Sequence, residues 1–166
     1  MELHEALYTT RAMRRVTDQP IPLDAQARIL DAAIRAPSGG NQQRWRFVLV
    51  DDKALIAAIA PLYRDAIDQL WRTVYRDRIE AAASAPRDDA SVQFDKVRVS
   101  AQWLADNFET VPLYLFAFSR FDPSGGSIYP AVWSSMLAAR AATYRMAPVV
   151  DRLETTYRAV LAVKGG

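Results

Sequence analysis

Apolar side chains recur every three or four residues along most of the chain, which is the spacing of amphipathic helices. This spacing predicts helices over residues 2–9, 23–35, 63–79, 94–107, 127–144 and 148–166. Between the second and third of these, Asp52 can cap a helix that Pro61 ends or restarts. The 127–144 segment is apolar on both faces, which predicts a helix buried at the centre of a domain or in a subunit interface.

Two shorter segments have the composition and length of β-strands. Residues 45–50 (WRFVLV) are rich in β-branched and aromatic side chains. Residues 111–118 (VPLYLFAF) form a continuous apolar run, as expected for a strand that is covered on both faces. Loops containing proline or glycine separate the elements, notably at 84–91 and 119–127. No internal repeat is present, and a chain of 166 residues suits a single domain.

The composition excludes several kinds of active site and partner, although it says little about the fold. Hydrophobic residues make up 51% of the chain and charged residues 24%, which is typical of a globular protein. The net charge is +2 and the arginines are spread along the chain, which argues against nucleic acid as a partner. With no cysteine and only one histidine, His4, a disulfide framework, a thiol nucleophile and most zinc sites are excluded. An organic cofactor is therefore the obvious source of any chemistry.

The sequence shows no pattern typical of export or of membrane insertion. Its amino-terminal residues carry charges without an apolar core, so no secretory signal is expected. The longest uncharged run, residues 123–139, is too short and too polar to span a bilayer. We therefore expect a soluble, cytoplasmic protein without a membrane partner.

A basic cluster follows the first predicted helix and could bind an anion. Its members are Arg11, Arg14 and Arg15, whose guanidinium groups suit bidentate contacts with a phosphate or a carboxylate. A solvated basic face is the competing interpretation, because short basic clusters are common on protein surfaces.

A polar glycine turn, Ser38 to Gln43, joins the second predicted helix to the first strand. It offers backbone N–H groups without side-chain obstruction, and carboxamides that both donate and accept hydrogen bonds. Such a turn could hold a planar heterocycle, and a helix C-cap followed by a polar loop is the competing interpretation. In the strand that follows, Trp45 is expected in the core and Arg46 on the opposite face. No carboxylate pair or Ser-His-Asp order stands out, so no catalytic residue is assigned.

Three segments, in this order and spacing, resemble the FMN-dependent nitroreductase family: TTRAMRR, APSGGNQQRWRFVLVDD and GGSIYPAVWSSMLAARA. The resemblance covers Leu3 to Ala142. It implies an α+β fold, with a mixed, mostly antiparallel sheet flanked by helices, assembled as an intimate homodimer with two FMN sites at the subunit interface. Residues 1–166 would form one nitroreductase-like domain, of which 1–142 are family-like.

The resemblance also implies which residues bind the cofactor. Arg11 and Arg14 match basic residues that hold the FMN phosphate and ribityl chain, while Ala12 stands where the family usually has Ser. Arg44 replaces a common Pro of the family. The full set of implied cofactor-binding positions is Arg11, Ala12, Arg14, Pro37, Ser38, Gly39, Asn41, Gln43, Ser127, Ile128 and Tyr129.

The activity implied by the resemblance is a two-step exchange of electrons. NAD(P)H would give a hydride to the flavin and leave before a nitroaromatic, a quinone or a related acceptor takes the electrons in the same pocket. The protein would contribute the placement of the ring and the charge around it, and no metal would take part.

The carboxyl-terminal residues depart from the family pattern. After LAARA the family continues with a Gly-Leu-Gly turn, a Thr-rich strand and a long extension, whereas residues 143–166 predict an atypical helical tail and an early end. A truncated, catalytically silent flavin-binding or dimerisation protein of the same fold is therefore the main alternative. A third possibility is an arginine-rich module that binds an acidic partner.

Overall fold

The computed structural model describes residues 1–84, 88–142, 145–153 and 156–164. Its contacts divide the chain into two compact units. We call Met1–Asp51 with Thr110–Gly166 the sheet unit and Asp52–Glu109 the helical unit. The prediction that residues 1–166 form one domain concerns how these units associate, and it stays a prediction.

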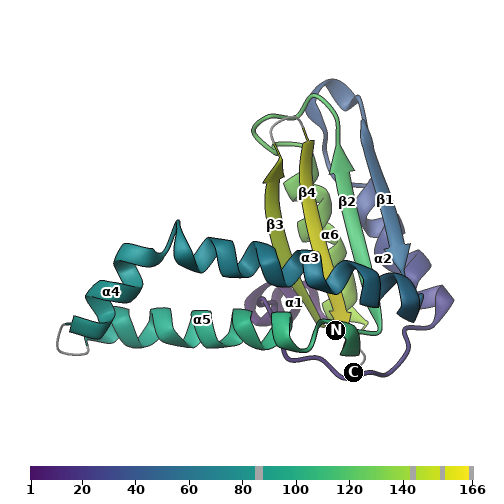
Figure 1. Cartoon of the computed structure of the whole chain (residues 1–166). Helices are drawn as coiled ribbons and strands as arrows, with labels where there is room; N and C mark the ends of the chain where they lie inside the picture. The colour runs from purple at the N-terminus through teal and green to yellow at the C-terminus, as the bar shows by residue number, and fades with distance from the viewer. Residues whose placement is uncertain (85–87, 143–144, 154–155, 165–166) are drawn as a thin grey trace. The chain divides into compact units, whose positions relative to one another are not determined.

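The sheet unit contains four described strands in the order β1-β2-β4-β3 (Figure 1). They are β1 (Trp45–Val50), β2 (Leu113–Ser119), β3 (Arg145–Leu153) and β4 (Thr156–Lys164). Neighbouring strands in this sheet pair antiparallel, and Trp45 of β1 lies opposite Ser119 of β2. The predicted strands at 45–50 and 111–118 are confirmed, as is the predicted α+β class with helices beside an antiparallel sheet.

Residues 145–153 and 156–164 form strands, so the prediction of a helical tail over 148–166 is wrong there, and its residues 154–155 and 165–166 lie outside the described residues. β3 and β4 pair with each other, and β4 also pairs with β2 over Leu113–Ser119. The segment is rich in valine, which favours strands, although its apolar residues also recur at helical spacing. Pairing with β2 gives the backbone of β4 hydrogen-bond partners, and the local spacing of apolar residues carries no information about such a distant partner.

The described part of the sheet unit has three α-helices, α1 (Leu3–Thr9), α2 (Leu23–Ile34) and α6 (Ile128–Ala141), and a short 3-10 helix at Gly39–Asn41. The predicted helices at 2–9 and 23–35 are confirmed, and the one at 127–144 ends at Ala141. α2 and α6 share one core with alternate residues of β1 and β2, including Ile29, Trp45, Leu115, Ile128 and Met136. The expected core position of Trp45 is therefore confirmed, and its side chain is 6% exposed.

The helical unit consists of α3 (Lys53–Arg72), α4 (Arg76–Ser84) and α5 (Asp89–Asp106). Asp52 caps α3 as predicted, because its Oδ1 accepts a hydrogen bond from the Leu55 amide at 2.9 Å. Asp88 caps α5 in the same way through the Ser91 amide. None of the helices within the described ranges is both long and apolar enough to cross a bilayer.

Three predicted boundaries in the helical unit are wrong. The helix predicted at 94–107 already begins at Asp89, inside the loop expected at 84–91. Pro61 neither ends nor restarts a helix but lies inside α3. A proline there leaves the carbonyl four residues earlier without its helical donor, and that residue, Ala57, is exposed, where water can serve instead. The helix predicted to run from 63 to 79 stops at Arg72, and α4 begins four residues later at Arg76.

Candidate functional site

The glycine turn is held in an unusual backbone conformation. Gly40, Asn41 and Gln43 have φ values of 58°, 54° and 48°, in the left-handed region that side chains other than Asn and Asp seldom adopt. Backbone hydrogen bonds within the turn are joined by two that involve side chains: the Gln43 amide donates to Ser38 Oγ at 3.1 Å, and Gln43 Nε2 donates to Asn41 Oδ1 at 3.1 Å. Strain of this kind persists where the surrounding structure fixes it, and it is frequent at binding sites.

A second turn connects β2 to α6 and also contains left-handed residues. Phe121 has a φ of 56°, and Gly125 has a φ of 73°. A Cβ at Gly125 would lie 2.2 Å from the Tyr129 ring, so both the backbone angle and the lack of space require glycine at this position. Asp122 Oδ2 accepts hydrogen bonds from the amides of Ser127 at 3.0 Å and Ile128 at 2.9 Å, which satisfies the first donors of α6.

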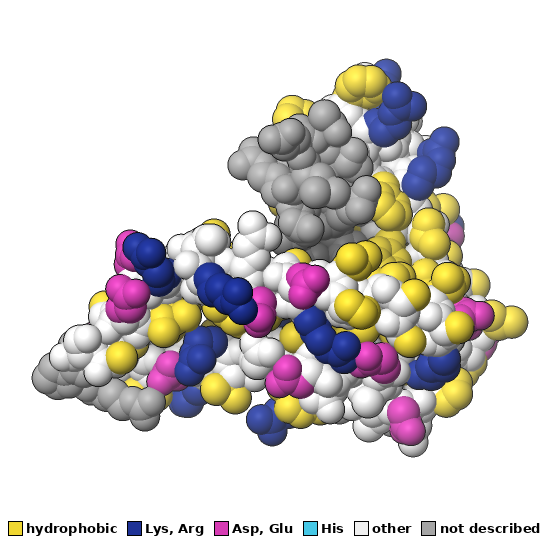
Figure 2. Space-filling model, in the orientation of Figure 1, with side chains coloured by type: hydrophobic (Ala, Val, Ile, Leu, Met, Phe, Trp, Pro, Cys, Tyr) yellow, Lys and Arg dark blue, Asp and Glu magenta, His cyan; other side chains and the backbone are white. Residues whose placement is uncertain are grey.

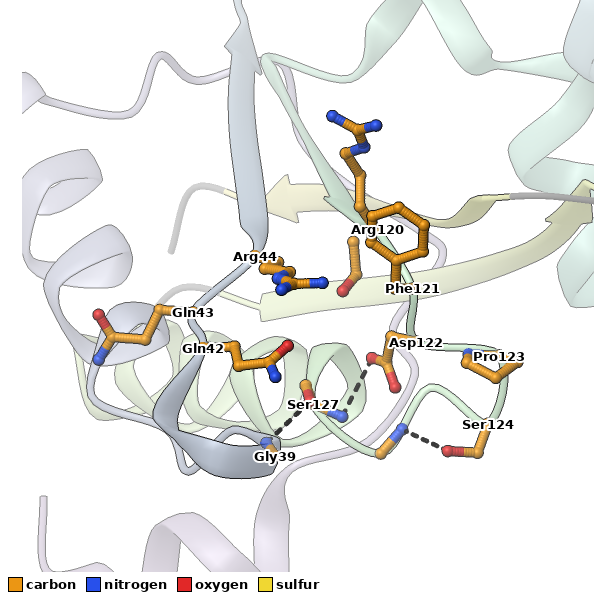
Figure 3. Close-up of a pocket in the computed structure, with 12 residues that line it drawn as sticks. Gly39, Gln42, Gln43, Arg44, Arg120, Phe121, Asp122, Pro123, Ser124 and Ser127 are labelled. Carbon is orange, nitrogen blue, oxygen red and sulfur yellow. Dashed lines mark hydrogen bonds between the residues drawn. The ribbon is translucent and has the colours of Figure 1, made fainter.

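The two turns enclose a cavity, which we call the turn cavity (Figure 3). They are joined directly, because the Gly39 amide donates to Ser127 Oγ at 3.2 Å. The volume of the turn cavity is about 450 Å³, within the range typical of small-molecule sites. Its walls are formed by Gly39, Gln42, Gln43, Arg44, Ser119, Arg120, Phe121, Asp122, Pro123, Ser124, Gly126 and Ser127.

Polar groups around the turn cavity suit the edge of a heterocycle. The exposed side chain of Gln42 points toward the cavity, and its carboxamide can donate to a ring oxygen and accept from a ring N–H (Figure 3). The Gln43 side chain points away from the cavity, toward Asn41. Among the described residues of the wall, one carries a carboxylate: Asp122, which is bonded to two amides of α6. The cavity is therefore built for binding and orienting a ligand, and its wall supplies no uncommitted acid or base.

Several of the predicted cofactor-binding residues lie at the turn cavity. Gly39, Gln43 and Ser127 are in its wall, and Pro37, Ser38 and Asn41 belong to the same turn as Gly39. Ile128 is fully buried in the core and its amide is bonded to Asp122. Tyr129 is 38% exposed, and its ring covers Gly125.

The other predicted residues, Arg11, Ala12 and Arg14, lie at the opposite end of α6. Arg140, in the last turn of α6, donates from Nε to Thr9 Oγ1 at 2.9 Å, and Arg11 follows two residues later. The 14 residues of α6 span about 21 Å. In Figure 1, residues 10–22 run across the end of the sheet unit where α6 ends and α2 begins. Within one chain, the basic cluster and the glycine turn are therefore well separated.

Nine residues of the turn cavity were not among the predicted site residues: Gln42, Arg44, Ser119, Arg120, Phe121, Asp122, Pro123, Ser124 and Gly126. Arg44 and Arg120 come together because β1 and β2 pair in a particular register. Sequence spacing contains no information on that register. The one available signal was the turn SRFDPSGGS, in which a large aromatic residue follows a buried strand and precedes a glycine pair.

Solved structures of similar fold include two flavoproteins. One is oxidised iodotyrosine deiodinase bound to FMN and 3-iodo-L-tyrosine, with a TM-score of 0.74, 21% identity and coverage of 98% of this chain and 89% of that one. The other is an FMN- and NADPH-dependent nitroreductase from Sphigopyxis sp. strain HMH, with a TM-score of 0.65, 20% identity and coverage of 100% and 89%. At these identities the likeness establishes the fold.

Sequence comparisons give the same family. A putative NADH dehydrogenase/NAD(P)H nitroreductase from Archaeoglobus fulgidus is 34% identical over 62 residues, which is 37% of this chain and 36% of the relative. The alignments span about a third of the length of the curated relatives. The sequence pattern of the Nitroreductase family matches residues 7–149, most of the chain. The predicted resemblance is thus confirmed, and the protein belongs to the Nitroreductase family.

Proposed function

We propose that the protein is an FMN-dependent oxidoreductase that uses NAD(P)H to reduce nitroaromatics, quinones or related acceptors. We further propose that it works as a cytoplasmic homodimer. The observation that supports this most strongly is the turn cavity, where a strained glycine turn presents the Gln42 carboxamide beside the first turn of α6. Membership of the Nitroreductase family supports the same assignment.

The residues of the turn cavity fit the edge of a flavin. The Gln42 carboxamide provides both a donor and an acceptor, as the oxygen- and nitrogen-bearing edge of an isoalloxazine ring requires. At Gly39 a Cβ would meet only Ser127 Oγ, at 3.8 Å, so the backbone leaves room for a ring to approach. Arg11 and Arg14 would hold the phosphate through charged hydrogen bonds.

The proposed homodimer explains why the two halves of this site lie apart in one chain. The glycine turn is at the first residue of α6 and the basic cluster is near its last turn. A twofold axis that pairs two chains in opposite directions would set the glycine turn of one beside the basic cluster of the other. Each of the two FMN sites would then contain residues of both chains.

The wall of the turn cavity would act by binding and orientation. When bound, FMN would supply the redox chemistry, accepting a hydride from the nicotinamide and passing electrons to the acceptor. The Gln42 carboxamide would fix the ring edge, and the arginines would balance the negative charge that a reduced flavin and its phosphate bring. Asp122 would keep α6 and Ser127 in place without entering the reaction.

Purification in the presence of FMN tests the proposal. We expect yellow protein with one FMN per chain, a dimer by sedimentation, and oxidation of NADH or NADPH when a nitroaromatic or a quinone is added. Flavin binding without turnover would instead support the catalytically silent alternative. Colourless protein that takes up no added FMN would contradict both, and would leave the acidic-partner interpretation.

A further inference from the structure

Arg44 and Arg120, two positively charged residues, occupy directly opposite positions at the end of the sheet. Beyond the last strand pair, Trp45 with Ser119, the Arg120 amide donates to the Arg44 carbonyl at 3.1 Å. Like charges at directly opposite positions of an antiparallel pair destabilise it. Figure 2 shows Lys and Arg side chains over this end of the sheet, where β1 begins and β2 ends.

Within the described residues, neither of these guanidinium groups has a carboxylate partner. Each lies 5.3 Å from the centre of the Phe121 ring, which is a weak contact for an exposed cation. The nearest acid in the wall, Asp122, is bonded to the amides of Ser127 and Ile128. The positive charge facing the turn cavity is therefore not balanced by an acidic group of its wall.

Phe121 adds a second unfavourable feature at the same place. Its ring is 76% exposed, and its φ of 56° is a costly conformation for a bulky residue. Figure 3 shows the ring beside the Arg120 side chain, with Arg44 at the start of the neighbouring strand. The cavity thus combines an exposed aromatic ring, a strained backbone and two positively charged residues. This combination agrees with a binding role better than with a stabilising one.

We propose that Arg44, Arg120 and Phe121 form a subsite for the anionic group of a flat aromatic ligand. The ring of the ligand would lie against Phe121, and its anion would be held by the two guanidinium groups. This inference rests on the proposed function, and it narrows the ligand class to acceptors with a carboxylate on the ring. A phosphate on the adenosine of NADPH offers the same chemistry, and the test separates the two sources.

Paired ligands test the subsite by direct binding. The FMN-loaded wild type, R44Q, R120Q and R44Q/R120Q are titrated calorimetrically with 4-nitrobenzoate and with uncharged nitrobenzene. We expect the double variant to lose about 10-fold in affinity for 4-nitrobenzoate relative to nitrobenzene. R46Q is the matched control, because Arg46 is also exposed at this end of β1 but is not in the wall of the cavity. The control should keep the wild-type ratio of affinities.

The coenzyme arm compares NADPH with NADH binding to the same variants. If the double variant loses affinity for NADPH alone, the subsite is supported and its anion is the coenzyme phosphate. Equal losses for charged and uncharged ligands in both arms would overturn the subsite, as would the same loss in R46Q or no loss at all. The FMN content of each variant is measured by absorbance, so that failure of the proposed cofactor site is recognised separately.

The thermal midpoint gives a readout that does not depend on turnover or on FMN. Neutralising one of two opposed charges should raise the midpoint of R44Q or R120Q above that of the wild type. In the wild type, 4-nitrobenzoate should raise the midpoint more than nitrobenzene does. A lower midpoint in both single variants, with no effect of 4-nitrobenzoate on the wild type, would mean that the two arginines support the fold instead.

Discussion

The two ends of α6 are built differently. At its first residue, two turns with left-handed residues meet, and Asp122 and Ser127 bind them to the helix and to each other. At its last turn, Arg140 bonds to Thr9, and Arg11 follows in a segment that is neither helix nor strand. One end has a preorganised cavity, whereas the other offers positive charge on an extended segment. A site that needs both must therefore take them from two chains, which is our central proposal.

The largest effect is expected at Gly125, in the more constrained end. In G125A the new Cβ would lie 2.2 Å from the Tyr129 ring, and φ is 73°. We expect a loss of about 2–4 kcal/mol in the free energy of unfolding, measured by chemical denaturation. G39A is the control, because its Cβ would meet only Ser127 Oγ at 3.8 Å. Equal stability of the two variants would show that the second turn is not constrained as described.

The next effect concerns the opposite end of α6. Arg11→Ala should weaken FMN binding by about 1.5–3 kcal/mol, because a charged hydrogen bond to phosphate is lost. Flavin fluorescence during titration of protein freed of cofactor measures this directly. Arg15→Ala, in the same basic cluster, is the comparison and should have a smaller effect. Unchanged affinity in Arg11→Ala would remove Arg11 from the proposed site.

The cap of α6 should contribute less. Asp122→Ala removes the acceptor for the Ser127 and Ile128 amides, and we expect a loss of about 1–2 kcal/mol in unfolding free energy. Asp122→Asn keeps an acceptor and should retain most of that stability. If Asn and Ala are equally destabilising, the carboxylate acts through its charge and not through the cap.

The smallest effect is expected at the end of α2, just before the glycine turn. Hydrogen bonds from Arg35 to Asp31 lower the pKa of Asp31 below its ordinary value of 3.8. A lowered folded-state pKa means that this contribution to stability is present above pH 3.8 and disappears as the pH falls through the folded pKa. The small difference in stability between wild type and Asp31→Asn should therefore vanish in acid. A difference that persists unchanged in acid would exclude this ion pair as its cause.

Much of the fold could be predicted because it depends on residues that are close together in the sequence. The helix at 23–35, the strand at 45–50 and the cap at Asp52 depend on near neighbours, and all were predicted. Residues 148–166 were misread because Val-rich segments fit a helix or a strand equally until a partner strand is known. Pro61 was misread because an exposed helix tolerates the lost hydrogen bond.

The candidate site likewise has a part that could be predicted from the sequence and a part that could not. The glycine turn and Ser127 were recognisable from short motifs, and the structure brings them together through the bond between Gly39 and Ser127. Arg44 and Arg120 are 76 positions apart in the numbering, and only the β1–β2 register sets them face to face. Strand register depends on pairing between distant segments, so spacing within either segment alone could not predict the basic subsite.

Subunit complementation tests the central proposal most directly. Arg11→Ala impairs one half of the proposed site, and Asn41→Gly impairs the other while keeping the left-handed backbone at φ 54°. When the two variants are mixed as subunits, half of the dimers should be hybrids, each with one intact and one doubly impaired site. The account predicts that about a quarter of all sites regain wild-type FMN affinity. A mixture that shows only the weak binding of its two components would contradict a site shared between chains.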